Sequence, residues 1–412
     1  MTDASHAPAP LAGVRVLDVS RFVSGPLCTF LLASMGAEVI SIESPRTSTS
    51  RRLPPFAHPD GGSTREYVDG ALSIPFLKRS RGKRSVALDL TRPAGARLVR
   101  TMAERSDVLV ENSRSDAMVS FGLGYEQVAA VNPALVYCAI SGYGYDAPER
   151  PAMDNIVQAS SGAMAKTGFP DGPPLRSGLT IADHASATYA ALGILAALRQ
   201  RDTTGCGQLV DVAMNDVLTA SVWDEPVDHY AAIGAPPRTG NADGRGAPIN
   251  TYRCADGWIS VTCTSDKQWQ QMCNLMERDD AFARWPTIRE RAGAAAEIDA
   301  AMEAWTSTRP VRAVEDALLA IGMPAGRVRD PIEAVDDADL RARGLLTELR
   351  HPSAPPERPS GFLGASLPIS FDGRVDLPPA ELLGSSTDAV LREIAGCTAD
   401  ELADLRADGV IA

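Results

Sequence analysis

The stretch VRVLDVSRFVSGPLCTFLLASMGAEVISIE, from Val14 to Glu43, decides the expected fold. Its first part, Val14 to Ser20, is apolar and β-branched, as buried strands are. A Gly-Pro pair then opens the apolar segment Leu27 to Met35, and a second β-rich run follows at Glu38 to Glu43. A strand, a helix and a strand in this order predict a βαβ unit with parallel strands.

The same alternation continues along the chain. A helical pattern lies at Pro93 to Arg105. Further strand-like runs lie at Arg84–Leu90, Asp107–Asn112, Leu135–Gly142 and Gln208–Met214. This pattern predicts the α/β class, with a Rossmann-like, doubly wound parallel sheet that holds ligands at the carboxyl ends of its strands. The first turn, SRFVSGPL, lacks the GxGxxG fingerprint, which argues against a nicotinamide dinucleotide.

The alternation stops after the strand that ends at Met214. A Gly/Pro-rich segment (234–248), a hairpin at Thr251 to Cys263 and three helical runs follow. At 412 residues the chain exceeds the roughly 250 to 300 residues of a single core. We therefore expect a large domain in residues 1–215, a smaller α+β domain in residues 216–325, and a segment at 326–412 that returns to the large domain.

Composition narrows the class of protein. The formal charge of −12 argues against nucleic acid or an anionic membrane as a partner, and no apolar run approaches the roughly 20 residues of a membrane span. The Pro/Ala-rich start, residues 1–13, predicts a short disordered leader in a cytoplasmic protein. Seven cysteines without CxxC spacing predict reduced thiols, and five scattered histidines predict no metal site.

Polar residues follow the predicted strands. They lie at Arg21–Ser24, Ser80–Lys83 and Asn112–Arg114. The run KRSRGKR, Lys78 to Arg84, is strongly basic within an acidic protein and is suited to phosphates. A solvated charged turn is an equally good interpretation of that run.

A second informative stretch runs from Met153 to Arg201. Two helical patterns, Asn155 to Thr167 and Asp183 to Arg199, flank the turn FPDGPP, which presents Asp171. One carboxylate on a short loop between rigid supports is typical of a catalytic site. By residue type alone, however, Pro-Asp-Gly is more often a plain turn.

Several motifs in this order resemble the class III CoA-transferases, a family that includes formyl-CoA transferase, carnitine CoA-transferase and the α-methylacyl-CoA racemases. The motifs are the first βαβ stretch, RGKRSVALDL, DVLVENSR with FGLGYEQV, LVYCAISGYG, and the block from TGFPDGPP to TGCGQLVDVAM. In that family the acid of the DGPP turn is the nucleophile. The resemblance therefore implies that Asp171 is catalytic.

The resemblance also implies a coenzyme A site along the strand ends. Carried over by motif, its residues are Val23, Ser24, Ser80, Arg81, Gly82, Lys83, Asn112, Ser113, Arg114, Ser141, Gly142 and Tyr143. Ser44 and Ser120 stand where the family often has basic residues, which removes two possible phosphate contacts. Arg51, Lys83 or Arg114 are the candidates to replace them.

The implied activity is acyl-CoA:carboxylate CoA-transfer through an aspartyl anhydride and an aspartyl-CoA thioester, with an acyl-CoA donor and a small carboxylic acid acceptor. Arg150 or Arg176 could meet a second carboxylate. One alternative is a racemase, but the family's GHD motif reads AMD here, and Met153 cannot exchange a proton. Asp183, the other racemase acid, then fits a helix N-cap. A CoA-binding protein without transfer activity is the third possibility.

Two further expectations concern assembly and motion. The resemblance implies an interlocked homodimer. The segment GNADGRG, with Gly240, Gly244 and Gly246, predicts a mobile loop over the active site, although an inert surface loop is equally consistent with its composition.

Overall fold

The computed structural model describes residues 8–412 except 47, 235, 237, 356, 358–360 and 372–374. The chain forms two compact units. Unit 1 comprises Met1–Ala163, Arg176–Glu225 and Ala338–Ala412, and unit 2 comprises Met164–Leu175 and Pro226–Asp337. The domain ranges expected from the sequence stay a prediction.

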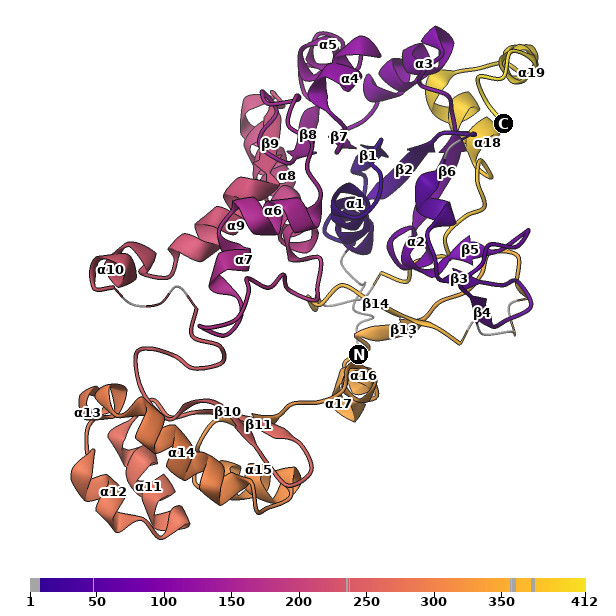
Figure 1. Cartoon of the computed structure of the whole chain (residues 1–412). Coiled ribbons are helices and arrows are strands. Elements are labelled where there is room, and N and C mark those ends of the chain that lie inside the picture. Colours follow the sequence, from indigo (N-terminus) through magenta and orange to yellow (C-terminus); the bar gives the residue numbers. More distant parts are fainter. Residues whose placement is uncertain are drawn as a thin grey trace, which may run out of the picture. The chain divides into compact units, whose positions relative to one another are not determined.

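Unit 1 is built on a six-stranded parallel sheet (Figure 1). Its strands are β1 (Arg15–Asp18), β2 (Glu38–Glu43), β6 (Lys83–Ala87), β7 (Val108–Glu111), β8 (Val136–Ser141) and β9 (Leu209–Ala213). Their order is β6-β2-β1-β7-β8-β9, so the chain moves from the centre to one edge and then from the centre to the other. This doubly wound order confirms the α/β class and the parallel sheet.

Helices cover both faces of this sheet. α1 (Ser24–Ser34) and α8 (Ile181–Thr204) cover one face, and α3 (Pro93–Ala103) covers the other. Successive strand residues point to opposite faces, and Val16 and Leu17 are accordingly buried in two different cores. Burial on both faces explains why these strands are continuously apolar rather than alternating.

Helix α8 is, by length and composition, apolar enough to cross a membrane, contrary to the expectation from the sequence. In the structure it packs against α1, β8 and β9. Its buried positions are mostly alanines, including Ala187, Ala190 and Ala197. Small side chains let neighbouring elements approach closely, so the apolar character of α8 is accounted for by the core of unit 1.

Two predicted helices are each divided in the structure. The pattern at Asn155–Thr167 forms α6 (Asp154–Ser160) and α7 (Ala163–Lys166), because Gly162 between them has a φ of +90°. Residues 215–232, whose composition also predicts one helix, form α9 (Met214–Trp223) and α10 (Val227–Ala232). Pro226 precedes α10, where a proline cannot continue the preceding helix.

Both ends of the chain contribute to unit 1. Residues 1–7 of the expected leader lie outside the described residues, but Leu11 is buried and its N–H donates to Met35 O at 2.9 Å. A leader disordered through residue 13 is therefore wrong. At the other end, α18 (Thr387–Val390) and the π-helical turn η2 (Leu391–Ala395) pack against the α3 face of the sheet.

The smaller elements of unit 1 complete the covering layers. They are η1 (Thr49–Arg52), β3 (Phe56–Ala57), β4 (Ser63–Thr64), β5 (Leu72–Ser73), α2 (Ile74–Arg79), α4 (Ser115–Ser120), α5 (Tyr125–Ala129), α17 (Ala338–Ala342), β13 (Leu346–Glu348), β14 (Leu363–Ala365) and α19 (Ala399–Ala407). β3 pairs with β4 and β5, and β13 pairs with β14.

Unit 2 contains a three-stranded antiparallel sheet with the order β10-β11-β12. Its elements beyond α10 are β10 (Ile249–Arg253), β11 (Trp258–Thr262), α11 (Asp266–Met276), α12 (Asp279–Arg284), α13 (Ile288–Gly293), α14 (Ala295–Thr306), α15 (Val311–Ala320), β12 (Ala325–Arg327) and α16 (Pro331–Val335). The predicted hairpin is confirmed by β10 and β11. Fully buried Trp269 lies in the core between these elements.

Candidate active site

The carboxyl ends of β1, β2 and β6 border a cavity of about 260 Å³ in unit 1. We call it the first cavity. Its lining includes Asp18, Glu43, Ser80, Lys83 and Asp89. A second cavity of about 680 Å³ lies in the same unit, at the ends of β7 and β8. Phe22 lines both cavities. Together they occupy the edge of the sheet where doubly wound folds bind ligands.

The turn between β1 and α1 is held by Asn112. Its Nδ2 donates to Arg21 O at 2.7 Å and to Ser24 Oγ at 3.2 Å, and its Oδ1 accepts from Arg21 N at 2.7 Å. Within this turn Phe22 has a φ of +64°, a conformation that side chains other than glycine seldom adopt. Such strain persists only where the surroundings enforce it, and Asn112 provides that restraint.

Lys83 is a buried structural cation. Its Nζ lies 2.9 Å from Asp18 Oδ2, 2.7 Å from Thr29 Oγ1 and 2.8 Å from Pro26 O. These three contacts match the three hydrogens of an ammonium group. The lysine therefore ties β6 to β1 and α1, and its side chain has no hydrogen left to donate to a ligand.

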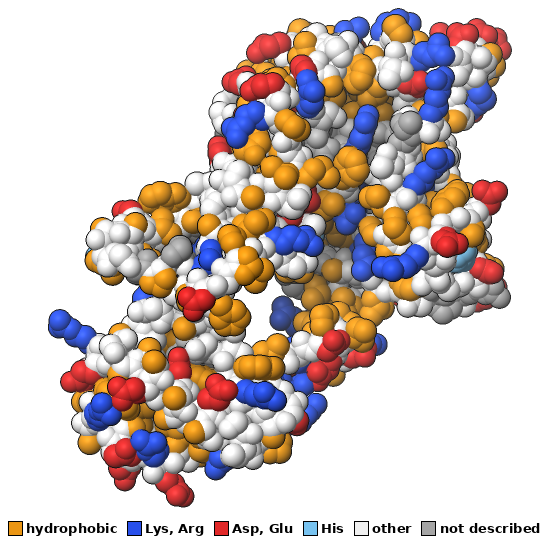
Figure 2. Space-filling model, viewed as in Figure 1, with side chains coloured by type: hydrophobic (Ala, Val, Ile, Leu, Met, Phe, Trp, Pro, Cys, Tyr) orange, Lys and Arg blue, Asp and Glu red, His pale blue; other side chains and the backbone are white. Residues whose placement is uncertain are grey.

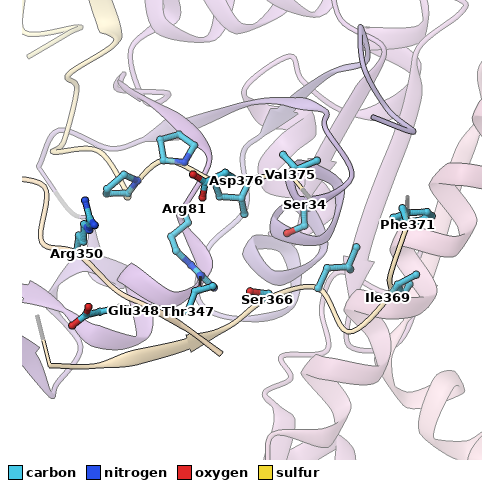
Figure 3. A pocket seen from close by; sticks show the side chains of 14 residues that line it. Ser34, Arg81, Thr347, Glu348, Arg350, Ser366, Ile369, Phe371, Val375 and Asp376 are labelled. Atoms are coloured by element: carbon cyan, nitrogen blue, oxygen red, sulfur yellow. Dashed lines mark hydrogen bonds between the residues drawn. The ribbon is translucent and has the colours of Figure 1, made fainter. Parts of the chain in front are cut away.

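Arg81 is also bonded within unit 1. Its guanidinium donates to Thr347 Oγ1 at 2.6 Å and to Ala365 O at 2.5 Å, and Figure 3 shows the side chain extended toward Thr347. It lines a separate cavity of about 450 Å³, formed with the C-terminal segment. Neighbouring Gly82, at a φ of +74°, donates its N–H to Pro378 O at 2.9 Å. Arg81 and Gly82 thus join the basic run Lys78 to Arg84 to the C-terminal segment.

The remaining residues expected to contact CoA are divided between the cavities. Ser80 lines the first, and the second is lined by Val23, Ser24, Asn112, Ser113, Arg114, Ser141 and Gly142. Tyr143 lines neither; its ring lies 3.5 Å from the guanidinium of Arg150. Of the proposed phosphate ligands, Arg51 is buried and bonded to Glu43, and Arg114 is exposed and paired with Asp116.

Asp183 lines the second cavity. Burial raises the pKa of its carboxyl group to about 6, and the nearby Asp154 carboxylate adds to this effect. The expected N-cap role is wrong, because α8 begins after Thr180 and Asp183 is already in its first turn. The capping acceptor is instead Asp154, whose Oδ1 accepts from Ala182 N at 2.8 Å and Asp183 N at 3.3 Å.

A second acid with an altered pKa lines this cavity. Glu111, at the end of β7, is only 1% exposed, and burial raises the pKa of its carboxyl group to about 8. Its Oε2 accepts from Ser113 N at 2.6 Å. No sequence motif points to Glu111 as a functional residue, since a glutamate at a strand end is ordinary by residue type.

Asp171 lies in unit 2, on an exposed turn. The turn is closed by Gly172 N donating to Phe169 O at 3.1 Å. Arg238 then donates to three carbonyl oxygens around it: Gly172 O at 2.7 Å, Phe169 O at 3.2 Å and Ala165 O at 3.2 Å. One guanidinium thus fixes the backbone on both sides of Asp171. No sequence motif points to Arg238, which lies 66 positions beyond Gly172.

The glycine segment packs against the same turn. Gly240 N donates to Gly168 O at 3.0 Å, and a side chain at Gly240 would meet the Phe169 ring at 2.6 Å. Gly240 therefore anchors the segment. Gly244 has open space around its Cα, and the N–H groups of Gly244 and Gly246 bond to none of the residues that the structure describes. The N–H of Gly172, by contrast, is already used.

Comparisons with known proteins agree with this architecture. The model of CoA-transferase family III matches residues 11–375. A succinyl-CoA:mesaconate CoA-transferase of Haloarcula hispanica is 35% identical over 84% of this chain and 86% of the relative. A formyl-CoA:oxalate CoA-transferase of Rhodopseudomonas palustris is 31% identical over 97% of each chain. The crystal structure of a CAIB/BAIF family protein from Brucella suis is 29% identical, with a TM-score of 0.80 over 94% of this chain and 100% of that one.

Proposed function

The chain belongs to CoA-transferase family III and is an acyl-CoA:carboxylate CoA-transferase, and we propose that Asp171 is its nucleophile. The observation that carries the proposal is the turn itself. Its carboxylate is exposed, while the carbonyls on both sides of it are fixed by Arg238. A nucleophile held on a rigid turn needs little reorganisation before it attacks.

The reaction proceeds by four exchanges at Asp171. The carboxylate attacks the thioester carbonyl of the donor, giving a mixed anhydride and CoA thiolate. The thiolate attacks the aspartyl carbonyl, releasing the donor acid and leaving an aspartyl-CoA thioester. The acceptor carboxylate attacks this thioester and expels the thiolate again, and the thiolate finally takes the acceptor acyl group, which regenerates Asp171. Each step conserves an activated acyl bond and divides one difficult exchange into easier ones.

Developing negative charge on the carbonyl oxygens requires hydrogen-bond donors. The N–H groups of Gly244 and Gly246 are suited to this role, because they bond to no residue in the described part of the chain. Gly172 is not suited, since its N–H is bonded to Phe169 O. We retain the glycine segment as a lid whose movable part begins after Gly240.

CoA is proposed to bind along the two cavities of unit 1. The contacts come from side chains and backbone groups that line them: Val23, Ser24, Ser80, Ser113, Arg114, Ser141 and Gly142. Asn112, Lys83, Arg81 and Gly82 support these contacts through the bonds described above rather than by direct charge. Tyr143 contributes through its stacking with Arg150.

The acceptor is proposed to carry a second carboxylate. Arg150 and Arg176 both line the second cavity, and both are exposed. A guanidinium recognises a carboxylate through two parallel hydrogen bonds. The relatives named for mesaconate and oxalate act on acids of this kind.

A homodimer in the cytoplasm remains our proposal for the assembled protein. Tyr189 and Leu192 of α8 are 51% and 62% exposed, and Figure 2 shows apolar side chains at the surface around α6. Apolar surface of this kind is suited to a second copy. The free cysteines suit a reducing compartment.

The racemase alternative has one observation in its favour, the pKa of about 6 for Asp183 in the second cavity. A two-base racemase needs a second proton carrier. The position of the family's histidine holds Met153, which also lines that cavity and has no exchangeable proton. Transfer is therefore the better-supported activity.

Asp171→Asn tests the assignment. The variant keeps the shape of the side chain but removes the nucleophilic charge, and the expected loss of CoA transfer is about 10³-fold or more, with CoA affinity unchanged. The matched control is Asp202→Asn, on the exposed surface of α8. Transfer at the parent rate in Asp171→Asn, or hydroxylamine trapping of an acyl group on another acid, would contradict the proposal.

A further inference from the structure

The cations of the basic run Lys78 to Arg84 have different surroundings. Arg81 and Lys83 are bonded within unit 1, as described above. Arg84 donates to Glu38 Oε1 at 2.7 Å and to Glu393 Oε2 at 3.0 Å. Lys78 is exposed at the surface of α2. The fifth cation is Arg79, the last residue of α2, and its surroundings are unlike those of the other four.

Arg79 lines the first cavity, and its Nε is buried without a hydrogen-bond partner in the described part of the chain. The rest of its guanidinium makes no hydrogen bond or ion pair to a described residue either. Burial lowers the pKa of Arg79, and the Asp183 carboxylate partly offsets this effect. A partly buried cation without a bonded partner is costly, so such a group in a native protein calls for an explanation.

The acids that line the first cavity do not provide the missing partner. Asp18 is bonded to Lys83 and Thr29, and Glu43 receives two hydrogen bonds of 2.7 Å from Arg51. Asp89 accepts from Thr91 Oγ1 at 2.6 Å and lies 3.8 Å from Nε of Arg46. Each carboxylate is therefore already matched, and the charge left over in the cavity is positive.

The hydroxyl groups that line the first cavity also favour a negatively charged ligand. Ser50 and Ser80 line the cavity, and their hydroxyl groups donate to no residue that the structure describes. Ser44 lines it too, at the position after β2 where the resembled family often has a basic residue. Two available hydroxyl donors, the partly buried guanidinium of Arg79 and the exposed guanidinium of Arg21, neither bonded to a described residue, form a site for an anion.

We propose that Arg79 binds a phosphate group of coenzyme A and replaces the basic residue absent at Ser44. The inference rests on the proposed CoA site of unit 1. A guanidinium suits this role because its planar donors form paired hydrogen bonds with phosphate oxygens. The phosphate supplies the acceptor that Nε lacks, and the binding of CoA removes the cost of the unpaired cation.

The test measures the dissociation constants of CoA, dephospho-CoA and pantetheine by calorimetry, for the parent protein, Arg79→Leu and Lys78→Leu. The Lys78 variant loses the same charge from the same helix but lines none of the three cavities. Arg79→Leu is expected to weaken CoA by about 10- to 100-fold and to leave pantetheine, which has no phosphate, unchanged. Lys78→Leu is expected to stay within about twofold of the parent for all three.

Dephospho-CoA identifies the phosphate group. If Arg79→Leu binds dephospho-CoA as tightly as the parent protein does, Arg79 contacts the 3′-phosphate. If its affinity for dephospho-CoA is also reduced, Arg79 contacts the diphosphate. Both results support the proposal. The thermal midpoint of Arg79→Leu without ligand is expected to equal or exceed that of the parent, because the variant removes an unpaired cation.

Three results would overturn the inference. They are unchanged CoA affinity in Arg79→Leu, an equal loss for pantetheine, and a rise in KM for the acceptor acid alone, which would make Arg79 a carboxylate ligand. Failure of the parent protein to bind CoA would instead count against the CoA site itself. Asp171 does not enter this assay, so the assignment of the nucleophile is tested separately.

Discussion

The strand-end cavities of unit 1 and the Asp171 turn of unit 2 use charged residues in opposite ways. In the first cavity Lys83 and Asp18 are buried and bonded to each other, with exposed side-chain fractions of 3% and 1%. On the turn the carboxylate is exposed, and the nearby cation, Arg238, bonds only to backbone oxygens in the described chain.

This difference separates two effects of substitution. Where a charged group is buried with its partners, removing it leaves another charge unpaired, and the loss appears in the free energy of unfolding. Where a charged group is exposed and held by the backbone, removing its support changes geometry with little effect on stability. Substitutions of the buried charges of unit 1 should therefore lower the free energy of unfolding, and substitutions that loosen the Asp171 turn should lower kcat.

The largest stability effect is expected for Lys83→Met. The change leaves Asp18 buried without its cation, and the free energy of unfolding is expected to fall by about 3–5 kcal/mol. Urea denaturation provides the measurement. Lys78→Met is the control, because Lys78 is exposed and its loss should cost less than about 1 kcal/mol. A loss of less than about 1 kcal/mol in Lys83→Met would show that the buried ion pair does not govern the stability of unit 1.

Arg238→Ala is expected to lower kcat rather than the free energy of unfolding. The turn loses three hydrogen bonds, Asp171 is less well placed, and kcat should fall by about 10- to 100-fold with little change in KM for the acyl-CoA. Added guanidinium at millimolar concentration should restore part of kcat, whereas a merely destabilised protein would not respond. Steady-state kinetics with and without guanidinium check this, and a rate unaffected by the substitution would remove Arg238 from a positioning role.

Glu111→Gln tests how the free energy of unfolding depends on pH when a buried acid of unit 1 is removed. The carboxyl group of Glu111 has its pKa raised from 4.5 to about 8 by burial, so the folded state holds a proton that the unfolded state releases. Stability from this group is present below pH 4.5 and is lost as pH rises toward 8, by up to roughly 1.4 kcal/mol per pH unit.

Glutamine has no proton to lose, so the variant should show a smaller fall in stability between pH 5 and 8. Urea denaturation across this range compares the two proteins. The neighbouring Asp211, whose own pKa is raised by burial, remains in both and serves as a common background. Equal slopes for parent and variant would show that Glu111 titrates normally.

The smallest effect is expected at the glycine segment. Gly244→Ala meets no atom within 4 Å, so it restricts the backbone without a clash. The ratio of thioester hydrolysis to transfer should rise about two- to fivefold, the size of a backbone restriction of roughly 0.4–1 kcal/mol. Gly246→Ala should act similarly, with a 3.1 Å approach to Ile288. Thiol release with and without acceptor measures the ratio, and an unchanged ratio would leave the segment an inert loop.

Local patterns were sufficient to predict the architecture. The alternation of apolar strands and helices depends on the period of side chains along a few residues, so β1, α1 and β2 were predicted to within a few residues. The same applies to the hairpin of β10 and β11. Asp171 was predicted from the short DGPP motif and from its resemblance to the class III CoA-transferases. Neither depends on which distant residues lie nearby in the fold.

The roles of the basic run were decided by tertiary structure alone. Lys83 meets Asp18 from 65 positions away, and Arg81 meets Thr347 from 266 positions away. Arg238 reaches the Asp171 turn from 66 positions beyond Gly172. Sequence shows that cations are present in Lys78 to Arg84. Only the fold brings the acceptors that satisfy Arg81 and Lys83 and, among the residues that the structure describes, provides none for Arg79, because hydrogen bonds form between neighbours in space.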